Sequence, residues 1–557
     1  MTDYFLQKSV SLGDELADLL GNSWHSPRQL GWPPDVFAVC AYLLEVSGAY
    51  INIMKAWPPN GDPGAWEEFI EKNASAWRRS ANATLAAYTD ETPSPPQVTP
   101  AAQSNIPREV KKLWRIVWSS RNVPVEQISL AENSKLCGAL LTLIALADAA
   151  CVGFGLPLDR DDPELDFSFE VQKLLITHGT FTPRLPRTRL CTLPKQHTPR
   201  LGITMRSLTH HLALFTGGEV APTWSVQGLE REPRFNLLVV PWPPEIFPTQ
   251  FSEAPVNYVH FGDPFKCFNY EVKAADDLLS RTSDHQGFEG YLQQIFLEAK
   301  MICGDIQGIV FPEAALTPGD FQTVERVSRN HGCSCVVAGV SGRDGQEPFN
   351  QVWMAFGLDE DRSDRVVKQG KHHRWQLNRS QIEMYGLGGS LDPKFKWWEH
   401  TGIEGRSVNF VAIHDELTIC CLICEDLARQ DPVAQLVRSV GPNLVIALLS
   451  DGPQIAQRWP ARYATVLADD PGSSVLTVTS LGMTQLATPP PGSSRSRVVA
   501  LWKDAENGLK EITLNPNAVA VVLNLWNYSE TEYTADGRSD GGVSTYPSLG
   551  GCHQIFL

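Results

Sequence analysis

The sequence lacks a long uninterrupted apolar run. Its most apolar stretch, residues 137–147, ends at Asp148 and is too short to cross a bilayer, so it favours a buried helix. The first 20 residues carry scattered charges and no continuous apolar segment, which argues against a signal peptide. These absences predict a cytoplasmic protein that does not span a membrane.

An excess of positive charge is also missing. The 557 residues include 47 Lys and Arg against 63 Asp and Glu, for a formal net charge of −16. A surface of that sign repels phosphate backbones, so general nucleic-acid binding is not expected. Hydrophobic residues make up 43% and charged residues 20%, which is ordinary for a globular protein. The length allows about three domains of roughly 100–200 residues.

The motifs of several common enzyme classes are absent. The sequence has no GxSxG nucleophile elbow, no phosphate-binding P-loop, no GxGxxG and no internal repeat. Its 12 cysteines are too few for a disulfide scaffold in a chain of this length. In a reducing compartment they are thiols, metal ligands or a nucleophile.

The first part of the chain is predicted to be helical. Apolar residues recur at helical spacing, and residues 1–158 are therefore assigned to a helical N-terminal domain. The proline-rich stretch 90–107 indicates a linker. Residues 159–234 alternate short runs with prolines and are assigned to an irregular connecting region, with one helix near 205–215 and a polar loop over 221–233. The predicted N-terminal helices cover residues 36–54, 65–88, 108–119 and 125–154.

From residue 235 the pattern changes to short apolar runs of strand length that alternate with helical stretches. This alternation predicts a layered α/β domain over 235–530, followed by a C-terminal tail over 531–557. Adjacent strands without a helix between them indicate that some pairs are antiparallel. The predicted strands are 236–242, 308–311, 335–340, 352–358, 410–415, 417–424, 443–449, 473–480, 497–502 and 518–525, and the helices are 288–303, 320–330, 433–439 and 458–468.

Three predicted strand ends each carry a reactive side chain. Glu313 follows the run GIVFP, Lys371 lies in the basic stretch after the fourth strand, and Cys424 ends LTICCLIC before a polar turn. Reactive residues gather at the carboxyl ends of strands in α/β sheets. The carboxylate can take the thiol proton, the thiolate can attack an electrophilic carbon, and the ammonium can stabilise the anion that develops.

The order Glu, Lys, Cys, in the contexts FPE, KHH and ICED, resembles the nitrilase (carbon–nitrogen hydrolase) superfamily. The run NLVIALLSDGPQ after Cys424 resembles the family's next strand and pocket loop, and the resemblance covers about residues 235–530. It implies a nitrilase-like four-layer α-β-β-α sandwich without a cofactor. It also implies that Glu313 is the general base, Cys424 the nucleophile and Lys371 the oxyanion stabiliser.

The resemblance implies further site residues. Many members of the family have a second glutamate near the lysine, and Glu383 is the nearest candidate. The backbone N–H of Glu425 would complete the oxyanion hole. Ser450 and Asp451 would line the substrate pocket.

Two features depart from the family's pattern. Lys368 stands shortly before Lys371, where the family usually has a tyrosine in a Tyr-x-Lys-like motif, so Lys368 is a rival for the catalytic lysine. Lys371 is preferred because the stretch after it follows the family's Lys-x-His-Leu segment. Glu425 stands where many members have tyrosine or tryptophan, which leaves the substrate preference open.

The same residues have plainer interpretations. Glu313 could be a carboxylate at a helix N-terminus, Lys371 part of a solvated basic turn, and Cys424 an inert core thiol. Cys421 and Cys424 could also join Cys333 and Cys335 around zinc. However, Cys421 and Cys424 would point to opposite faces of a strand, and structural zinc pairs normally sit on turns, so no metal is predicted.

Two functional hypotheses follow. The first is a thiol hydrolase that cleaves a non-peptide carbon–nitrogen bond in a small-molecule substrate, an amide rather than a nitrile. The second is a nitrilase-like sensor or assembly module whose helical N-terminal half binds a protein partner. Similar domains are joined to larger bacterial defence proteins, so an anti-phage role belongs to this second hypothesis. The family resemblance also implies a homo-oligomer.

Overall fold

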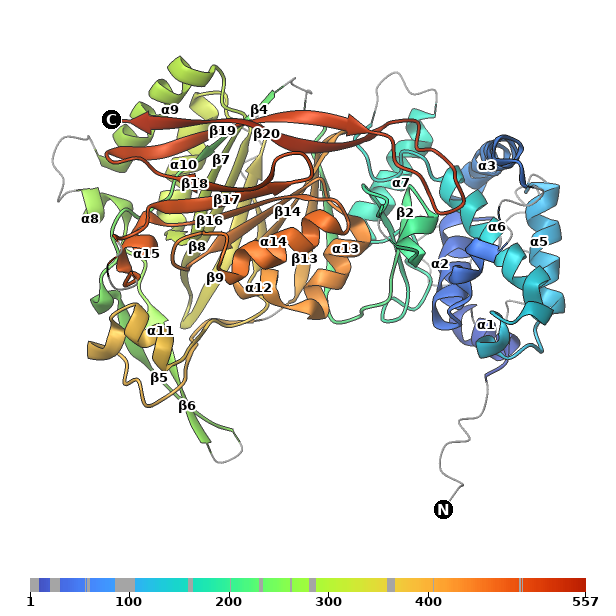
Figure 1. Ribbon diagram of the computed structural model, residues 1–557, viewed down its shortest axis with the longest axis horizontal. Helices are drawn as coiled ribbons and strands as arrows, with labels where there is room; N and C mark the ends of the chain where they lie inside the picture. The colour runs from blue at the N-terminus through green and yellow to red at the C-terminus, as the bar shows by residue number, and fades with distance from the viewer. Residues whose placement is uncertain are drawn as a thin grey trace. The chain divides into compact units, whose positions relative to one another are not determined.

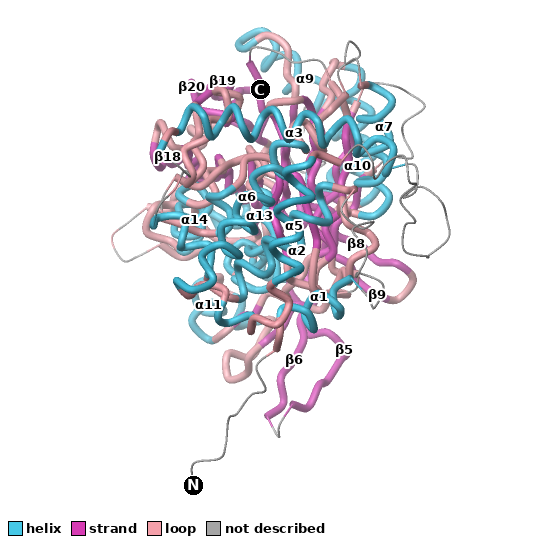
Figure 2. The backbone as a smooth tube through the Cα atoms, turned by 90° about the vertical axis from the view of Figure 1, so that its right-hand side faces the viewer, coloured by secondary structure: helices cyan, strands magenta, loops and turns pink. Residues whose placement is uncertain are grey.

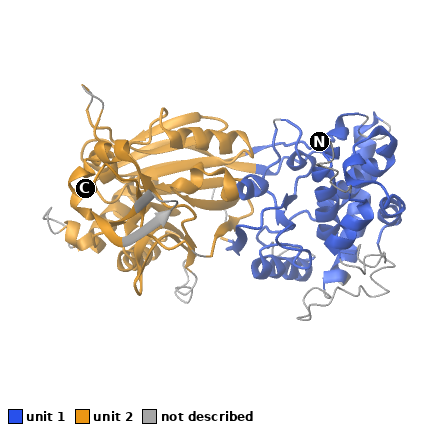
Figure 3. Cartoon of the chain, turned by 90° about the horizontal axis from the view of Figure 1, so that it is seen from below, with its two compact units in different colours: residues 1–228, 435–442, 529–544 blue, residues 229–434, 443–528, 545–557 orange. Residues whose placement is uncertain are grey.

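The chain forms two compact units in the computed structural model (Figures 1 and 3). Unit 1 comprises residues 1–228, 435–442 and 529–544, and unit 2 comprises residues 229–434, 443–528 and 545–557. The structure describes residues 10–20, 31–55, 57, 61–85, 106–158, 164–200, 202–229, 234–260, 263–279, 287–357, 366–403, 405–489, 492 and 494–557. Most of the predicted linker over 90–107 lies outside these residues.

Unit 1 is built around helix α6 (Ser134–Ala150), which is apolar on nearly every side and buries 13 of its residues. Helices α2 (Pro33–Val46), α3 (Pro63–Leu85) and α5 (Arg108–Ser119) pack against it (Figure 2). The N-terminal part is therefore mainly helical, as predicted. The other two α-helices described in this part of the chain are α1 (Leu12–Leu20) and α7 (Leu165–His178).

Two predicted helices of unit 1 are shorter than expected. Helix α2 ends before Gly48, whose φ of 66° turns the chain, and the segment continues as the 3₁₀ helix η2 (Ala49–Lys55). The predicted helix over 125–154 is split. Two short 3₁₀ turns, η4 (Val125–Gln127) and η5 (Ala131–Asn133), precede α6.

One helical stretch in the described part of the chain, Ala131–Ala150, is long and apolar enough to cross a membrane, and 72% of its most apolar window is buried. Helices α2 and η2 pass the same length and composition test together, but they are bent by 86° at the break between them.

The connecting region predicted over 159–234 is more regular than expected. It contains α7, strands β1 (Cys191–Pro194), β2 (Leu212–Phe215) and β3 (Ala221–Val226), and the 3₁₀ helix η6 (Met205–Leu208). The structure therefore places no boundary at residue 158. The helix predicted near 205–215 is wrong, because only η6 is helical and β2 pairs antiparallel with β1. A run of four apolar residues is too short for periodicity to separate a strand from a helix.

Unit 2 contains two large sheets. The first has the strand order β10-β9-β8-β7-β4-β19-β20, with parallel pairing at its centre between β4, β7 and β8. Its outer pairs β8–β9, β9–β10 and β4–β19 are antiparallel. The strands are β4 (Arg234–Val239), β7 (Gly308–Leu316), β8 (Cys335–Asp344), β9 (Glu347–Phe356), β10 (Val367–Gly370), β19 (Ala518–Glu530) and β20 (Ser544–Phe556).

The second large sheet contains the strands β18-β17-β16-β15-β14-β13 in this order. Strands β14, β15 and β16 are parallel, and the strands that flank them are antiparallel. Their bounds are β13 (Ser407–His414), β14 (Leu417–Ile423), β15 (Leu444–Leu449), β16 (Ser474–Thr479), β17 (Val498–Asp504) and β18 (Gly508–Thr513).

Helices cover the outer face of each large sheet, while the inner faces pack on one another (Figure 1). Helices α9 (Gly287–Cys303) and α10 (Pro318–Asn330) cover the first sheet through an apolar core. Helices α12 (Glu425–Ala428) and α14 (Trp459–Asp469) cover the second. The predicted four-layer α-β-β-α sandwich is confirmed.

The last residues do not form the predicted tail. Residues 529–544 belong to unit 1, and β20 lies beside β19 at the edge of the first large sheet. The short helix α13 (Gln435–Val440) also belongs to unit 1, where it packs against β1 and β2. Unit 1 thus includes residues 435–442, which were predicted to belong to the hydrolase domain, and residues 529–544, most of which were predicted to belong to the tail.

A small four-stranded sheet in unit 2 was not predicted. It has the order β11-β12-β6-β5, with β5 (Phe251–His260), β6 (Asp263–Tyr270), β11 (Gln376–Leu377) and β12 (Trp397–Glu399). Helices α11 (Arg379–Met384) and α15 (Leu481–Leu486) lie beside it. A separate aromatic core, which includes Phe268, Trp375 and Trp397, holds this part together.

Candidate active site

The predicted reactive residues come from strands of both large sheets, two of them central and one, β10, at a sheet edge. Glu313 lies in β7 where the register with β8 is interrupted, next to Ala314 with a φ of 47°. Lys371 follows β10, and its backbone N–H continues the pairing by donating to the carbonyl of Asn350 at 3.1 Å. Cys424 follows β14 directly and begins α12. The sandwich thereby brings residues far apart in the sequence to one place.

Lys371 lies between two carboxylates. Its Nζ is 2.7 Å from Oε1 of Glu313 and 2.6 Å from Oε2 of Glu399. The cluster is buried except at the edge of Glu399. The side chains of Lys371 and Glu313 are 0% and 1% exposed, and the side chain of Glu399 is 12% exposed. A buried ammonium needs such partners, because an unpaired charge in this environment would be very costly.

Asn350 in β9 joins the two carboxylates. Its Nδ2 donates to Oε1 of Glu313 at 2.8 Å and to Oε1 of Glu399 at 2.7 Å. The backbone N–H of Trp375 donates to Oε2 of Glu399 at 3.0 Å. Glu399 is therefore held at three points, and it in turn fixes the position of the Lys371 ammonium.

The second carboxylate oxygen of Glu313 is bound from the other large sheet. The backbone N–H of Ser450, directly after β15, donates to Oε2 of Glu313 at 2.6 Å. The hydroxyl of Ser450 also donates to the Glu313 carbonyl at 3.3 Å. Glu313 is thus oriented by both sheets, which limits the positions its carboxylate can take.

Cys424 has an unusual backbone. Its φ of 47° and ψ of −107° lie where a non-glycine residue is rare, and its N–H donates to the carbonyl of Leu448 at 2.9 Å. A residue held in such a conformation costs of order 1–3 kcal/mol and is found mainly at functional sites. The sharp strand-to-helix turn presents the thiol while its exposed fraction remains 3%.

The charges of the cluster set the protonation states. Burial raises the pKa of the Cys424 thiol well above its usual range, and the negative charge of Glu313 raises it further, while Lys371 opposes both. Burial also raises the pKa of Glu313, although Lys371 lowers it in part. Burial would lower the pKa of Lys371, but the two carboxylates overcome this effect and raise it well above the usual range. These directions favour a neutral thiol and a charged ammonium, and they make the Glu313 carboxylate a stronger base than an ordinary glutamate.

A carboxylate two residues after the cysteine ties this turn to the lysine segment. Asp426 accepts the backbone N–H of His372 with both oxygens at 3.1 Å, and its Oδ1 is 2.9 Å from Nδ1 of His373. Burial acts to raise the pKa of Asp426, yet these histidine contacts hold it below its ordinary value. Since His372 directly follows Lys371, the contact ties the Lys371 segment to the turn that begins at Cys424.

The remaining sequence-predicted residues differ in where they lie. Glu383 is not at the site, because it forms an ion pair with Arg379 on α11 at 2.8 Å and its side chain is 58% exposed. Lys368 is also outside, with its Nζ 4.0 Å above the ring of Trp353. Glu425 forms an ion pair with Arg429 at 2.8 Å. Asp451 accepts the Tyr385 hydroxyl at 2.7 Å and binds Arg458 at 2.6 Å, directly after Ser450.

Glu399 is the site residue that sequence reasoning missed. It lies beside Lys371, where Glu383 was expected, although it follows Lys371 by 28 residues. The only local signal is a charged residue after two tryptophans in the short run KWWEH. Its partner strand β6 comes from more than 100 residues earlier in the chain, so spacing from Lys371 does not identify it.

A cavity of about 400 Å³ in unit 2 borders this cluster on the side of Asn350 and Glu399. Asn350, Glu399 and Ala314 form part of its wall, together with polar residues that include Arg343 and His400. A small polar molecule could therefore approach Glu399 and Asn350 directly. Among the described residues, no group of three or more His, Cys, Asp or Glu side chains could hold a metal ion.

No protein family matches the sequence, and no curated protein matches it. Among solved structures, Nit3 of Saccharomyces cerevisiae, a nitrilase-superfamily member, is 11% identical with a TM-score of 0.30, over 52% of this chain and 89% of that one. A CN-hydrolase superfamily protein of Xanthomonas campestris is 11% identical with a TM-score of 0.29, over 52% and 90%. A carbon–nitrogen hydrolase of Helicobacter pylori is 10% identical with a TM-score of 0.29, over 50% and 86%. These neighbours cover about half of this chain and leave the rest unmatched.

Proposed function

We propose that unit 2 is a thiol hydrolase that cleaves a non-peptide carbon–nitrogen bond, in an amide rather than a nitrile, through an acyl-enzyme on Cys424. The observation that carries this proposal is the Lys371 ammonium held 2.7 Å from Glu313 and 2.6 Å from Glu399, with a cysteine in a strained strand-to-helix turn beside them. These groups supply a base, a cation and a nucleophile in one buried cluster.

The first step is a coupled proton transfer and attack. Glu313 accepts the proton from the Cys424 thiol as sulfur forms a bond to the amide carbon and the C=O electron pair moves to oxygen. The raised thiol pKa argues against a standing thiolate, so the base is needed at the moment of attack. Lys371 and the backbone N–H of Glu425 would hold the resulting oxyanion.

The second step releases the amine. The oxyanion re-forms the carbonyl, the carbon–nitrogen bond breaks, and Glu313 returns its proton to the leaving nitrogen. A thioester remains on Cys424. Water then attacks this thioester while Glu313 takes a proton, and collapse releases a carboxylic acid and restores the thiol. No cofactor takes part.

The net charge of the cluster favours this division of roles. Two carboxylates and one ammonium leave one negative charge, which disfavours a second anion on sulfur. A proton transfer from Cys424 to Glu313 moves this charge without adding to it. Lys371 cannot act as the base because its raised pKa keeps it protonated.

A second candidate function rests on the burial of the nucleophile. Cys424, Lys371 and Glu313 are only 3%, 2% and 3% exposed, which is also what a sealed, catalytically altered domain would have. In that case unit 2 would be a sensor or assembly module, and unit 1 would bind a protein partner. The two candidates differ in whether a substrate reaches the thiol.

Trapping the acyl-enzyme tests the proposal. The purified chain is incubated with primary amides and nitriles, released ammonia is measured, and Cys424 adducts are mapped by peptide mass spectrometry. Hydroxylamine should convert the thioester to a hydroxamate. We expect turnover and an adduct that the Cys424→Ala variant loses and the Cys420→Ala variant keeps, since Cys420 is a buried strand residue. Full activity of Cys424→Ala would refute the mechanism.

The sensor candidate has its own signature in a substrate-free test. Limiting iodoacetamide is applied across pH, and the half-exposed Cys303 and Cys552 provide an internal reference for ordinary thiols. Labelling of Cys424 that depends on Glu313 supports an accessible, base-assisted nucleophile. Cys424 that labels no faster than Cys420 and Cys421 supports the sealed module.

A further inference from the structure

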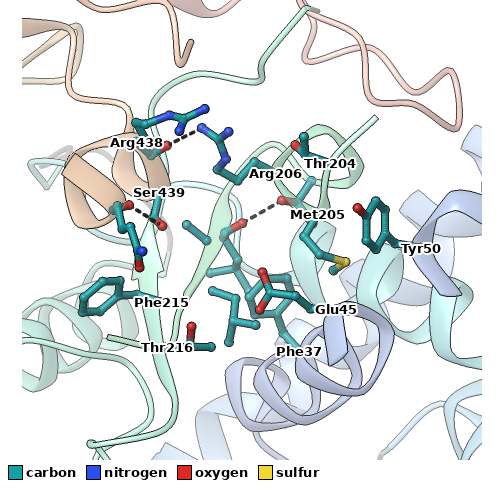
Figure 4. Close-up of a pocket in the computed structure, with 15 residues that line it drawn as sticks. Phe37, Glu45, Tyr50, Thr204, Met205, Arg206, Phe215, Thr216, Arg438 and Ser439 are labelled. Atoms are coloured by element: carbon teal, nitrogen blue, oxygen red, sulfur yellow. Dashed lines mark hydrogen bonds between the residues drawn. The ribbon is translucent and has the colours of Figure 1, made fainter. Parts of the chain in front are cut away.

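A second cavity, of about 410 Å³, lies in unit 1 and contains none of the groups proposed for catalysis. Its wall is built from three stretches of chain: α2 with η2, residues 204–216, and α13 (Figure 4). Its volume falls within the range of about 300–1,000 Å³ that is typical of small-molecule sites. The cavity is therefore large enough to be a binding site rather than a packing defect.

The floor of this cavity is apolar. Phe37 of α2 and both Leu212 and Phe215 of β2 line it, with exposed fractions of 2%, 0% and 3%. Figure 4 shows Phe37 and Phe215 on different sides of the cavity. Apolar side chains around an open space favour an apolar body over water alone.

The rim of the cavity is polar and carries a net positive charge. Arg206 and Arg438 contribute two cations and Glu45 one anion. Nη1 of Arg206 donates to the Arg438 carbonyl at 3.1 Å, which ties the Arg206 side chain to α13 (Figure 4). Tyr50 and Ser439 also line this space, and the Ser439 hydroxyl donates to the Gln435 carbonyl of its own helix at 2.9 Å.

We propose that this cavity binds a small organic anion, with its apolar body on the Phe37–Phe215 floor and its charged group at Arg206 and Arg438. Guanidinium groups bind carboxylates and phosphates through paired hydrogen bonds, and either anion fits this chemistry. An apolar floor beneath a cationic rim selects against both a neutral apolar molecule and a bare inorganic ion. Glu45 disfavours a ligand with more than one negative charge near its side of the rim.

The position of α13 in the chain gives ligand binding a measurable consequence. Residues 435–442 belong to unit 1, although the strands before and after them, β14 and β15, belong to unit 2. β14 leads into Cys424 and β15 into Ser450. An anion on Arg438 would restrain the segment that links these strands, so amide exchange over residues 435–440 should slow when the ligand binds.

Calorimetric titration of the full chain with matched probes tests this site. The probes are phenylacetate and phenyl phosphate, with 2-phenylethanol as the neutral analogue, and acetate and inorganic phosphate as anions without an apolar body. We expect saturable binding of phenylacetate or phenyl phosphate, and the preferred one identifies the anion class. The neutral and bodiless probes should bind at least about tenfold more weakly.

Two variants locate the site. Arg206→Gln removes one cation, and Thr216→Glu adds a carboxylate at an exposed rim position, so a folding defect in one leaves the other informative. Each should weaken the anion by about tenfold or more. Arg200→Gln, at an exposed arginine of unit 1 that pairs with Glu530, should leave binding unchanged.

Three outcomes would overturn the assignment. These are the absence of saturable binding by either organic anion, equal binding of 2-phenylethanol, and anion binding that neither rim variant alters. All measurements are repeated on Cys424→Ala, which should bind the anion as the unsubstituted chain does. The test of the anion site in unit 1 is therefore independent of the proposed hydrolase activity.

Discussion

Replacing Glu399 with glutamine should shift the pH at which Glu313, the proposed catalytic base, ionises. Glu399 raises the pKa of Glu313 by its negative charge, second in importance to burial among the raising effects. Both carboxylates accept from Asn350 Nδ2, at 2.8 and 2.7 Å, so the two accepting oxygens are at most about 5.5 Å apart. Glutamine keeps the size of the side chain and removes the charge.

The expected size of the shift follows from this distance. Two unit charges about 5.5 Å apart interact by about 3 kcal/mol at an effective dielectric constant of ~20. That energy corresponds to about 2 pH units. Since removing a neighbouring negative charge favours ionisation, the pKa of Glu313 should fall in Glu399→Gln. The acid limb of any process that needs ionised Glu313 then moves to lower pH.

The assay is the rate of Cys424 alkylation by iodoacetamide as a function of pH, read by peptide mass spectrometry. Glu383→Gln is the matched control, because this glutamate is exposed and pairs only with Arg379 among the described contacts. Its profile should match the unsubstituted chain. An acid limb that stays in place or moves upward in Glu399→Gln, with the thermal transition unchanged, would refute the electrostatic argument.

Three further predictions concern the site and the core of unit 1. Cys424→Ala should abolish turnover while circular dichroism and the melting temperature stay close to those of the unsubstituted chain. Asp426→Asn should lower kcat about tenfold or more and lower the melting temperature, because it weakens the contact to the lysine segment. Asp148→Asn should cost about 3 kcal/mol in the free energy of unfolding, measured by urea titration, because Asp148 accepts three backbone N–H groups at 2.8 Å. Burial acts to raise the pKa of Asp148, but His211, Arg538 and His210 hold it below its usual value, so its contribution is present above about pH 4 and is lost as pH falls further.

The central strands could be predicted from the sequence because they are buried on both faces. β7, β14, β15 and β16 read as short continuous apolar runs, and every one of their residues is buried. The edge strands gave no such signal. β18 is largely exposed, and β20 contains a proline and two glycines, which are typical of loops.

The second glutamate shows most clearly that distance along the sequence does not predict which residues meet in the fold. Glu383 lies nearer to Lys371 in sequence, but it stands four residues after Arg379 on a short helix, where an exposed ion pair along the helix is the usual result. Glu399 reaches Lys371 because β12 pairs in parallel with β6, a contact between distant parts of the chain. Apolar patterns do not encode such pairings, so sequence reasoning selected the nearer residue.

Contacts between distant parts of the chain also explain why the predicted domain boundaries differ from the observed units. Asp148, buried in the last turn of α6, accepts the backbone N–H groups of His210, His211 and Leu212 and also lies 3.7 Å from Arg538. A charge at the end of an apolar run looks like the end of a helix when only neighbours in sequence are considered. In the folded unit Asp148 contacts two segments that are distant in sequence, because a buried carboxylate needs several hydrogen-bond donors and few are available from neighbouring residues. Chain segments that appear to be linker and tail are therefore required for the helical unit to bury this charge.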